Sequence, residues 1–318
     1  VSPEGQPFSG VVAMRNSRIP RTPFVALGMI GALALAGCGD DTGPSKTEIT
    51  EGEAVQAGTA ISGQVELMVS SFTVEDIANP TFFAPAQPGM AAASMISAGI
   101  CPDTSEGGDA DTDADGIPDD VTYTFNPAEC LFGSPATGTV ELDGSIRVID
   151  QSPTLVALNA TMSDFSFNFT AQGGDFLNTT VNGTRGVTIS SASASLNENL
   201  TADVTANSGG QSLAARLTTN WNADFNATGG TIAADQDLPS GTFTLDGTTN
   251  WLFNGESVAF SVDTHTPLAY DATCAAEQRF TSGELRALVE GNDAGAFVRI
   301  TYTGCGEDPE VLLIAGTA

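Results

Sequence analysis

Residues 217–226 read LTTNWNADFN, and their side chains alternate between two kinds. The odd positions carry Leu217, Thr219, Trp221, Ala223 and Phe225, whereas the even positions carry only Thr, Asn and Asp. Successive side chains of a β-strand point to opposite faces of a sheet. The stretch therefore predicts a strand with one buried and one solvated face, which is typical of antiparallel sheets.

The same period of two recurs along the chain from about residue 120, for example at Val140 and Leu142. Three late strands are predicted at 283–290, 296–304 and 310–315. We therefore expect residues 90–318 to form one mainly β domain. Its strands should follow one another as an antiparallel meander of hairpins, which forms a sandwich or a curved, barrel-like sheet.

Four Asp-Gly or Asn-Gly dipeptides occur in this region, at 143–144, 182–183, 246–247 and 254–255. Both residues of such a pair tolerate positive φ, so each dipeptide predicts a tight hairpin turn. Between Val156 and Phe169 the apolar positions change from even to odd. One extra residue would restore the buried face, which predicts a β-bulge at Ser163-Asp164.

Residues 50–89 precede the β domain and are expected to hold a short helix and a Pro-rich connection. Thr50 and Glu53 have the spacing of a capping box, and apolar residues recur near a helical period, so we expect a helix over 51–72. Three glycines weaken this pattern, and the alternation at 65–69 leaves a strand as the alternative. The segment NPTFFAPAQPG at 79–89 cannot continue a helix.

The N-terminal region carries the pattern of an export signal. From Met14 it reads MRNSRIPRTPFVALGMIGALALAGCGDD, with arginines at 15, 18 and 21 before an apolar run that ends at Ala36. The last two residues of the run begin the tetrapeptide Leu35-Ala36-Gly37-Cys38, which resembles the lipobox of bacterial lipoprotein signal peptides. A buried N-terminal helix is the alternative, but it does not account for this order of segments.

The resemblance implies a signal peptide over 14–37 that is removed before Cys38. It also implies that Cys38 carries a diacylglycerol and an acylated amine, so that 38–49 is a lipidated tether to a membrane. Residues 1–13 are then expected to be a spurious upstream extension. Because Gly39 stands where an aspartate would retain the protein at the inner membrane, the resemblance implies an outer-membrane lipoprotein, periplasmic or surface-facing.

Four of the five cysteines remain after Cys38 is assigned to lipidation, at 101, 130, 274 and 305. An even number of cysteines in an exported chain predicts two disulfides, for which three connectivities are possible. We favour the sequential pairs Cys101–Cys130 and Cys274–Cys305, each of which closes a loop of about thirty residues. Four unpaired thiols are the alternative.

The stretch GGDADTDADGIPDD at 107–120 is strongly acidic. Asp111, Asp113 and Asp115 occupy positions 1, 3 and 5 of an EF-hand-type calcium loop, Gly116 the turn, and Ile117 the position whose carbonyl binds the ion. Clustered carboxylates repel one another until a divalent cation neutralises them. A solvated acidic turn without a metal is the alternative.

Position 12 of this loop holds Thr122 where a bidentate acid is expected, and Asp119 and Asp120 are candidates to replace that acid. The spacing DxDxDGxxD resembles a single thrombospondin type 3 repeat. The resemblance implies calcium as a structural cofactor. An incomplete ligand set predicts weak affinity, roughly in the 10⁻⁴–10⁻³ M range of extracellular modules.

The charge balance limits the partners of this chain. It has 318 residues with 10 Lys+Arg against 39 Asp+Glu, a formal net charge of −29. Such a chain repels phosphate backbones, so nucleic-acid binding is excluded. Because 41% of the residues are hydrophobic and only 15% are charged, a folded domain is expected all the same.

Catalytic signals are weak. The chain has one histidine and one lysine, and no nucleophile motif was found. Trp221 and Trp251 are a possible platform for a hydrophobic or glycan ligand, although their apolar faces favour core packing. We expect a non-catalytic, lipid-anchored cell-envelope protein with a structural, adhesive or ligand-binding role. The alternative is a secreted carboxylate-based hydrolase such as a glycosidase.

Overall fold

The computed structural model describes one helix and most of the β domain. The expected signal peptide, Cys38 and most of the tether lie outside the described residues, as does the Pro-rich connection. The described residues are 48–70, 72, 101, 103–104, 111–112, 119–134, 138–151, 156–233, 237–253, 256–274, 278–292 and 295–315.

The strands form a single antiparallel sheet, in which the order across the sheet follows the order along the chain. The exception is β3, which pairs with the same strand as β2. The helix is α2 (Glu51–Ser70), and the strands are β1 (Asp103–Thr104), β2 (Asp120–Phe125), β3 (Leu131–Ser134), β4 (Gly138–Asp150), β5 (Val156–Thr170), β6 (Phe176–Ile189), β7 (Ser193–Ser208), β8 (Gln211–Ala227), β9 (Gly241–Phe253), β10 (Glu256–Tyr270), β11 (Phe280–Val289), β12 (Phe297–Tyr302) and β13 (Glu310–Ile314).

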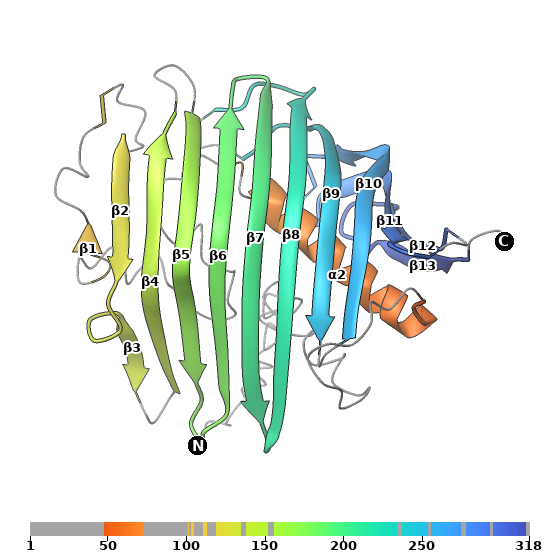
Figure 1. The fold of residues 1–318 in the computed structure, drawn as a ribbon. Coiled ribbons are helices and arrows are strands. Elements are labelled where there is room, and N and C mark those ends of the chain that lie inside the picture. Colours follow the sequence, from red (N-terminus) through yellow and green to blue (C-terminus); the bar gives the residue numbers. More distant parts are fainter. Residues whose placement is uncertain are drawn as a thin grey trace, which may run out of the picture.

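The sheet is curved and open. In Figure 1, β4 to β9 stand side by side, α2 lies behind β7 to β10, and β11 to β13 turn back beside the helix. β1 and β13 are the two edge strands and do not pair with each other. The expected mainly β meander with one N-terminal helix is confirmed, and of the expected shapes it takes the curved sheet.

The two faces of the sheet differ sharply in polarity. We call the face against α2 the inner face and the opposite face the outer face. Trp221, Phe225 and Phe243 point to the inner face and are fully buried, and Phe72 packs its ring 6.4 Å from both phenylalanines. Burying each such side chain stabilises the fold by about 1.5–3 kcal/mol. The alternation in residues 217–226 thus predicted the buried face correctly.

The helix begins at the predicted capping box. The Thr50 N–H donates to Glu53 Oε2 at 2.7 Å, and the Glu53 N–H donates to Thr50 Oγ1 at 3.3 Å. These two bonds satisfy backbone donors that a helix leaves free at its start. The predicted helix over 51–72 is confirmed except at its last residues, since α2 ends at Ser70.

Contacts at Gly58 and Ser62 place the middle of α2 against the last two strands. A Cβ on Gly58 would lie 2.4 Å from Val311 Cγ1, so glycine lets the helix backbone approach β13 closely. The Ser62 and Tyr302 hydroxyls are hydrogen-bonded at 3.0 Å in a buried position, and burial raises the pKa of Tyr302. Tyr302 therefore stays protonated and ties the helix to β12.

The predicted bulge in β5 is confirmed. The register of β5 with β6 shifts between Met162 and Phe165, and Asp164 has a φ of 48°. Asn182 stabilises this backbone, because its Oδ1 accepts the Asp164 N–H at 2.8 Å and its Nδ2 donates to the Asp164 carboxylate at 3.1 Å. The extra residue returns Phe165 and Phe167 to the inner face, as the change of phase requires.

Three of the four predicted hairpin turns are wrong. The dipeptides 143–144, 182–183 and 246–247 lie inside β4, β6 and β9, which continue past them. Their glycines do have positive φ, but an ideal Cβ on Gly183 would lie 2.1 Å from the Asn199 carbonyl oxygen of β7. Glycine is therefore required at these positions because neighbouring strands approach closely, and not because the chain reverses direction. The fourth dipeptide lies outside the described residues, between Phe253 and Glu256, which pair as strand ends.

Two disulfides close loops at either end of the sheet. Cys101 pairs with Cys130 at a Cα–Cα distance of 5.4 Å, and Cys274 pairs with Cys305 at 5.8 Å. The favoured sequential connectivity is confirmed. Cross-links of this loop length stabilise a fold by about 3–4 kcal/mol in the chain-entropy account.

Within the described ranges, no helix has the length and apolar character that a membrane crossing requires.

The glycine in the middle of β6 gives a stability test. Gly183→Ala should lower the free energy of unfolding by about 1–3 kcal/mol, because alanine at a φ of 132° is strained and its Cβ would clash with β7. Gly186→Ala is the matched control on the same strand, since its Cβ would meet only Leu158 O at 3.8 Å. We expect the control to stay within about 0.5 kcal/mol of the native protein in urea unfolding. Equal losses for both variants would contradict the proposed close approach.

Candidate functional site

The outer face of β5 to β8 presents ordered rows of amide and hydroxyl side chains. The register places Asn159, Gly186, Asn197 and Asn222 in one row across the four strands. The next row holds Thr161, Thr184, Asn199 and Asn220. Neighbouring strands lie about 4.8 Å apart and alternate residues of one strand about 6.7 Å apart, so these side chains form a regular grid.

A hollow of about 350 Å³ lies within this grid. Gly186 lacks a side chain, and the polar side chains around it rise from the neighbouring strands. We call this the asparagine hollow. Its outward-pointing lining residues are Asn159, Thr184, Gly186, Thr188, Asn197, Asn199, Asn220 and Asn222, with Gln151 at the end of β4.

Four inward-pointing residues also border the hollow, namely Leu158, Val187, Glu198 and Trp221. All four are buried, with their side chains on the inner face. Alternation along the strand means that only their backbone is turned toward the hollow. The hollow therefore offers amides, hydroxyls and backbone, and no charged side chain.

Most amides of the hollow retain free hydrogen-bonding capacity. The Asn222 Nδ2 donates to Asp246 Oδ2 at 3.4 Å. Asn159, Asn197, Asn199 and Asn220 make no side-chain hydrogen bond to any described residue. An asparagine side chain carries two N–H donors and an acceptor oxygen. The hollow can therefore both donate to and accept from a bound molecule.

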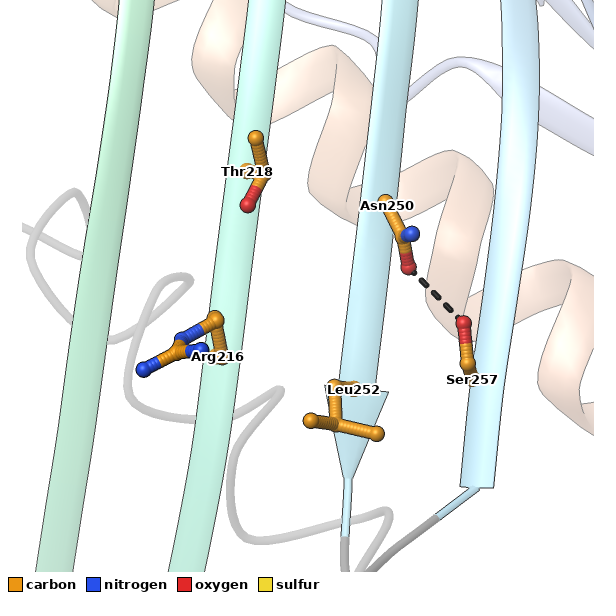
Figure 2. Close-up of a pocket in the computed structure, with 5 residues that line it drawn as sticks. All are labelled: Arg216, Thr218, Asn250, Leu252 and Ser257. Carbon is orange, nitrogen blue, oxygen red and sulfur yellow. Dashed lines mark hydrogen bonds between the residues drawn. The ribbon is translucent and has the colours of Figure 1, made fainter. Parts of the chain in front are cut away.

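A second, smaller hollow of about 130 Å³ lies on the same face of β8 to β10. Figure 2 shows its lining residues on the side of the strands away from α2. The Ser257 hydroxyl donates to Asn250 Oδ1 at 3.0 Å, and Arg216 is paired with Asp203 on β7 at 2.6 Å. Its lining residues are Arg216, Thr218, Asn250, Leu252 and Ser257.

The inner face holds a buried polar cluster beneath the asparagine hollow. Arg185 on β6 donates from Nε to Glu198 Oε2 at 2.9 Å and also from Nη2. The Thr219 hydroxyl donates to Glu198 Oε1 at 3.0 Å. Glu198 is only 7% exposed, so its charge is neutralised by these donors. Losing one partner of such a pair leaves an uncompensated buried charge, which typically costs about 3–5 kcal/mol.

The two tryptophans proposed as a platform lie on the inner face and not on the outer one. Trp221 is fully buried, and its Nε1 has no hydrogen-bond partner. Trp251 packs 5.4 Å from Phe260 and donates from Nε1 to Thr249 Oγ1 at 3.0 Å. Trp221 is thus a core residue, whereas Trp251 is partly buried and packs against the core from the inner face.

Only part of the acidic loop lies among the described residues. Thr112 donates its N–H and its hydroxyl to the Asp119 carboxylate at 2.9 and 2.5 Å, which lowers the pKa of Asp119. Arg147 donates two bonds to Asp120, at 2.9 and 2.6 Å, and lowers the pKa of Asp120. Both carboxylates are therefore ionised at neutral pH.

These partners affect the expected calcium ligands differently. Asp119 joins the two ends of the loop at 112 and 119, whereas Asp120 would have to leave Arg147 to reach an ion. Asp113, Asp115 and Ile117 lie outside the described residues, and Asp111 is half-buried. No group of three metal-ligating side chains occurs within the described ranges. Calcium binding by this loop stays a prediction.

Comparison with known protein families, with curated proteins and with solved structures gave no match to this chain. Its function must therefore follow from the chemistry of its own residues.

The asparagine hollow was missed in the sequence, although a signal for it is present. Asn197 and Asn199 stand two residues apart in SLNENL, as do Asn220 and Asn222 in TTNWNAD. A period of two places each pair on one face. What the sequence did not supply was the register, which sets both pairs opposite each other.

The calcium prediction can be checked by thermal unfolding. Excess calcium, at about 5 mM, should raise the melting temperature relative to excess EDTA, because an ion that binds only the folded state stabilises it. The double variant Asp113→Asn/Asp115→Asn should lose this difference. Asp224→Asn, on the exposed outer face of β8, should keep it. A melting temperature that is the same in calcium and in EDTA would contradict the prediction.

Proposed function

We propose that this protein is a non-catalytic lipoprotein of the bacterial cell envelope, anchored through Cys38, which uses its outer sheet face to bind a ligand. The observation that carries the binding role is the asparagine hollow, whose side chains offer hydrogen bonds but no reactive group. Catalysis by proton transfer or by a nucleophile needs a titratable or activated side chain in reach of the substrate.

The two disulfides support export to an oxidising compartment. Disulfides persist in the bacterial periplasm and at the cell surface and are rare in the cytosol. They agree with the resemblance of residues 14–38 to a lipoprotein signal peptide, which rests on the sequence alone. By the same resemblance, we propose the outer membrane as the location.

The inner face is an unsuitable place for a carried lipid. Its large side chains on β8 and β9 are fully buried, and the two hollows described above open on the outer face. A carrier would need an apolar cavity of several hundred Å³. This favours binding on the outer face over carriage inside the curved sheet.

The hydrolase alternative gains no support from the described residues. A glycosidase needs two carboxyl groups about 5–9 Å apart that converge on one bond. Glu198 borders the asparagine hollow but is buried on the inner face in a pair with Arg185. Asp246, which accepts a hydrogen bond from Asn222, lies on the outer face, so these two carboxylates do not converge on one bond. The binding role is therefore preferred.

The placement of α2 separates the expected anchor from the hollow. The chain enters the described domain at 48–50, and the following half of α2 lies against β12 and β13. The asparagine hollow lies on β5 to β8, several strands away. A protein anchored through the tether would thus keep the hollow clear of its point of attachment.

Export and lipidation can be tested in bacteria that express the full chain. Cells fed with labelled palmitate should yield a labelled protein in the membrane fraction, because Cys38 is the expected acceptor. Cys38→Ser should remove the label without removing the two disulfides, which involve other cysteines. An unlabelled native protein that remains in the cytosol would contradict the proposal.

A further inference from the structure

We infer that the asparagine hollow binds a neutral, polyhydroxylated ligand, that is, a segment of an uncharged glycan. This inference rests on the proposed binding role of the outer face and names the class of ligand that its chemistry selects.

Charge excludes anionic ligands from the hollow. No outward-pointing lining residue is cationic or anionic. Arg147 on the neighbouring strand β4 is bound by Asp120, and Arg216 is bound by Asp203. With a net charge of −29, the chain also repels anions at longer range. A phosphate, a sulfated glycan or a nucleotide would therefore find no partner for its charge.

Polarity excludes apolar ligands. Binding of a lipid or an aromatic compound needs apolar area that becomes buried in the complex. The large apolar side chains that are exposed among the described residues are Val55, Leu131 and Leu288, and none of them lines the hollow. Its lining side chains are amides and hydroxyls. An apolar molecule bound there would take away their hydrogen bonds to water and offer none in return.

The hydrogen-bonding groups of the hollow match those of a sugar. A hydroxyl group both donates and accepts, and an asparagine amide offers both functions from one planar group. Asn197, Asn199 and Asn220 come from two adjacent strands and surround Gly186 with amides that have no described protein partner. Neighbouring hydroxyls of one sugar ring can thus be bonded by different amides at once.

Rigidity lowers the cost of binding. The grid belongs to the long central strands β5 to β8, which pair along nearly their whole length. Side chains already held by the register lose little freedom when a ligand arrives. Since no aromatic ring is available for stacking, we expect weak binding, with a Kd of about 0.1–10 mM per site.

Gly186 is the position that keeps the hollow open. A larger residue there would project from the outer face into the space above β6. The backbone tolerates a side chain, because an ideal Cβ meets only Leu158 O at 3.8 Å. Gly186→Val should therefore fill the hollow and leave the fold intact.

The test is isothermal titration calorimetry on the full-length, disulfide-bonded protein in detergent. Maltohexaose, cellohexaose and laminarihexaose serve as neutral probes, hexagalacturonate as the charged probe and laurate as the apolar probe. At least one neutral hexasaccharide should bind at concentrations up to about 10 mM, whereas the charged and apolar probes should not.

Variants then locate the binding. Asn199→Ala/Asn220→Ala and Gly186→Val should each weaken binding of the neutral probe at least about tenfold, a loss of about 1.4 kcal/mol. Asn226→Ala, an exposed asparagine near the end of β8 and outside the hollow, should bind as the native protein does. Unchanged melting temperatures will show that the weakened variants remain folded.

Three results would overturn the inference: no neutral probe binds, the hollow variants bind as well as the native protein, or hexagalacturonate or laurate binds more tightly than the neutral probes. Failure here is distinct from failure of the proposed function. A palmitate-labelled envelope protein that binds no neutral glycan would refute only the inference that the hollow binds a glycan. A cytosolic, unlabelled protein would refute the envelope proposal whatever it binds.

Discussion

The packing of α2 against one face of an open sheet is the constraint on which the rest of the structure depends. A single antiparallel sheet has two faces, and only one needs to be buried for stability. Here Ser62 of α2 is tied to Tyr302 on β12, and Phe72, just beyond the end of the helix, packs against the rings of Phe225 and Phe243. The sheet curves about the helix, and glycines such as Gly183 allow the close approach between strands that accompanies this curvature.

Because the apolar side chains pack on the inner face, the side chains on the outer face are mostly polar. The rows on β5 to β8 follow from the register, because each strand repeats the same alternation opposite its neighbour. Function on such a surface is limited to what amides and hydroxyls can do, which is recognition by hydrogen bonds. The Arg185–Glu198 pair, in which Glu198 is buried and Arg185 partly buried, lies on the other side of the same strands.

The sequence predicted the features that depend on local pattern. The alternation at 217–226, the capping box at Thr50, the bulge at Ser163-Asp164 and the disulfide pairs are all local or count-based signals, and each was confirmed. The hairpin positions were not predictable from Asp-Gly and Asn-Gly alone, because a glycine with positive φ serves a kink inside a strand as well as a turn. The asparagine hollow needed the register between β7 and β8, which no local pattern specifies.

In this structure the outer face of the sheet is open to solvent, whereas the inner face is covered. Single cysteines introduced at Asn220 and Asn222, and at Ala194 and Ala223 on the inner face, would measure this directly by their rate of reaction with a thiol reagent under native conditions. We expect fast labelling at 220 and 222 and strong protection at 194 and 223, where the native side chains are 2% and 1% exposed. Protection at all four positions would mean that a second layer covers the outer face, and would rule out an open outer face.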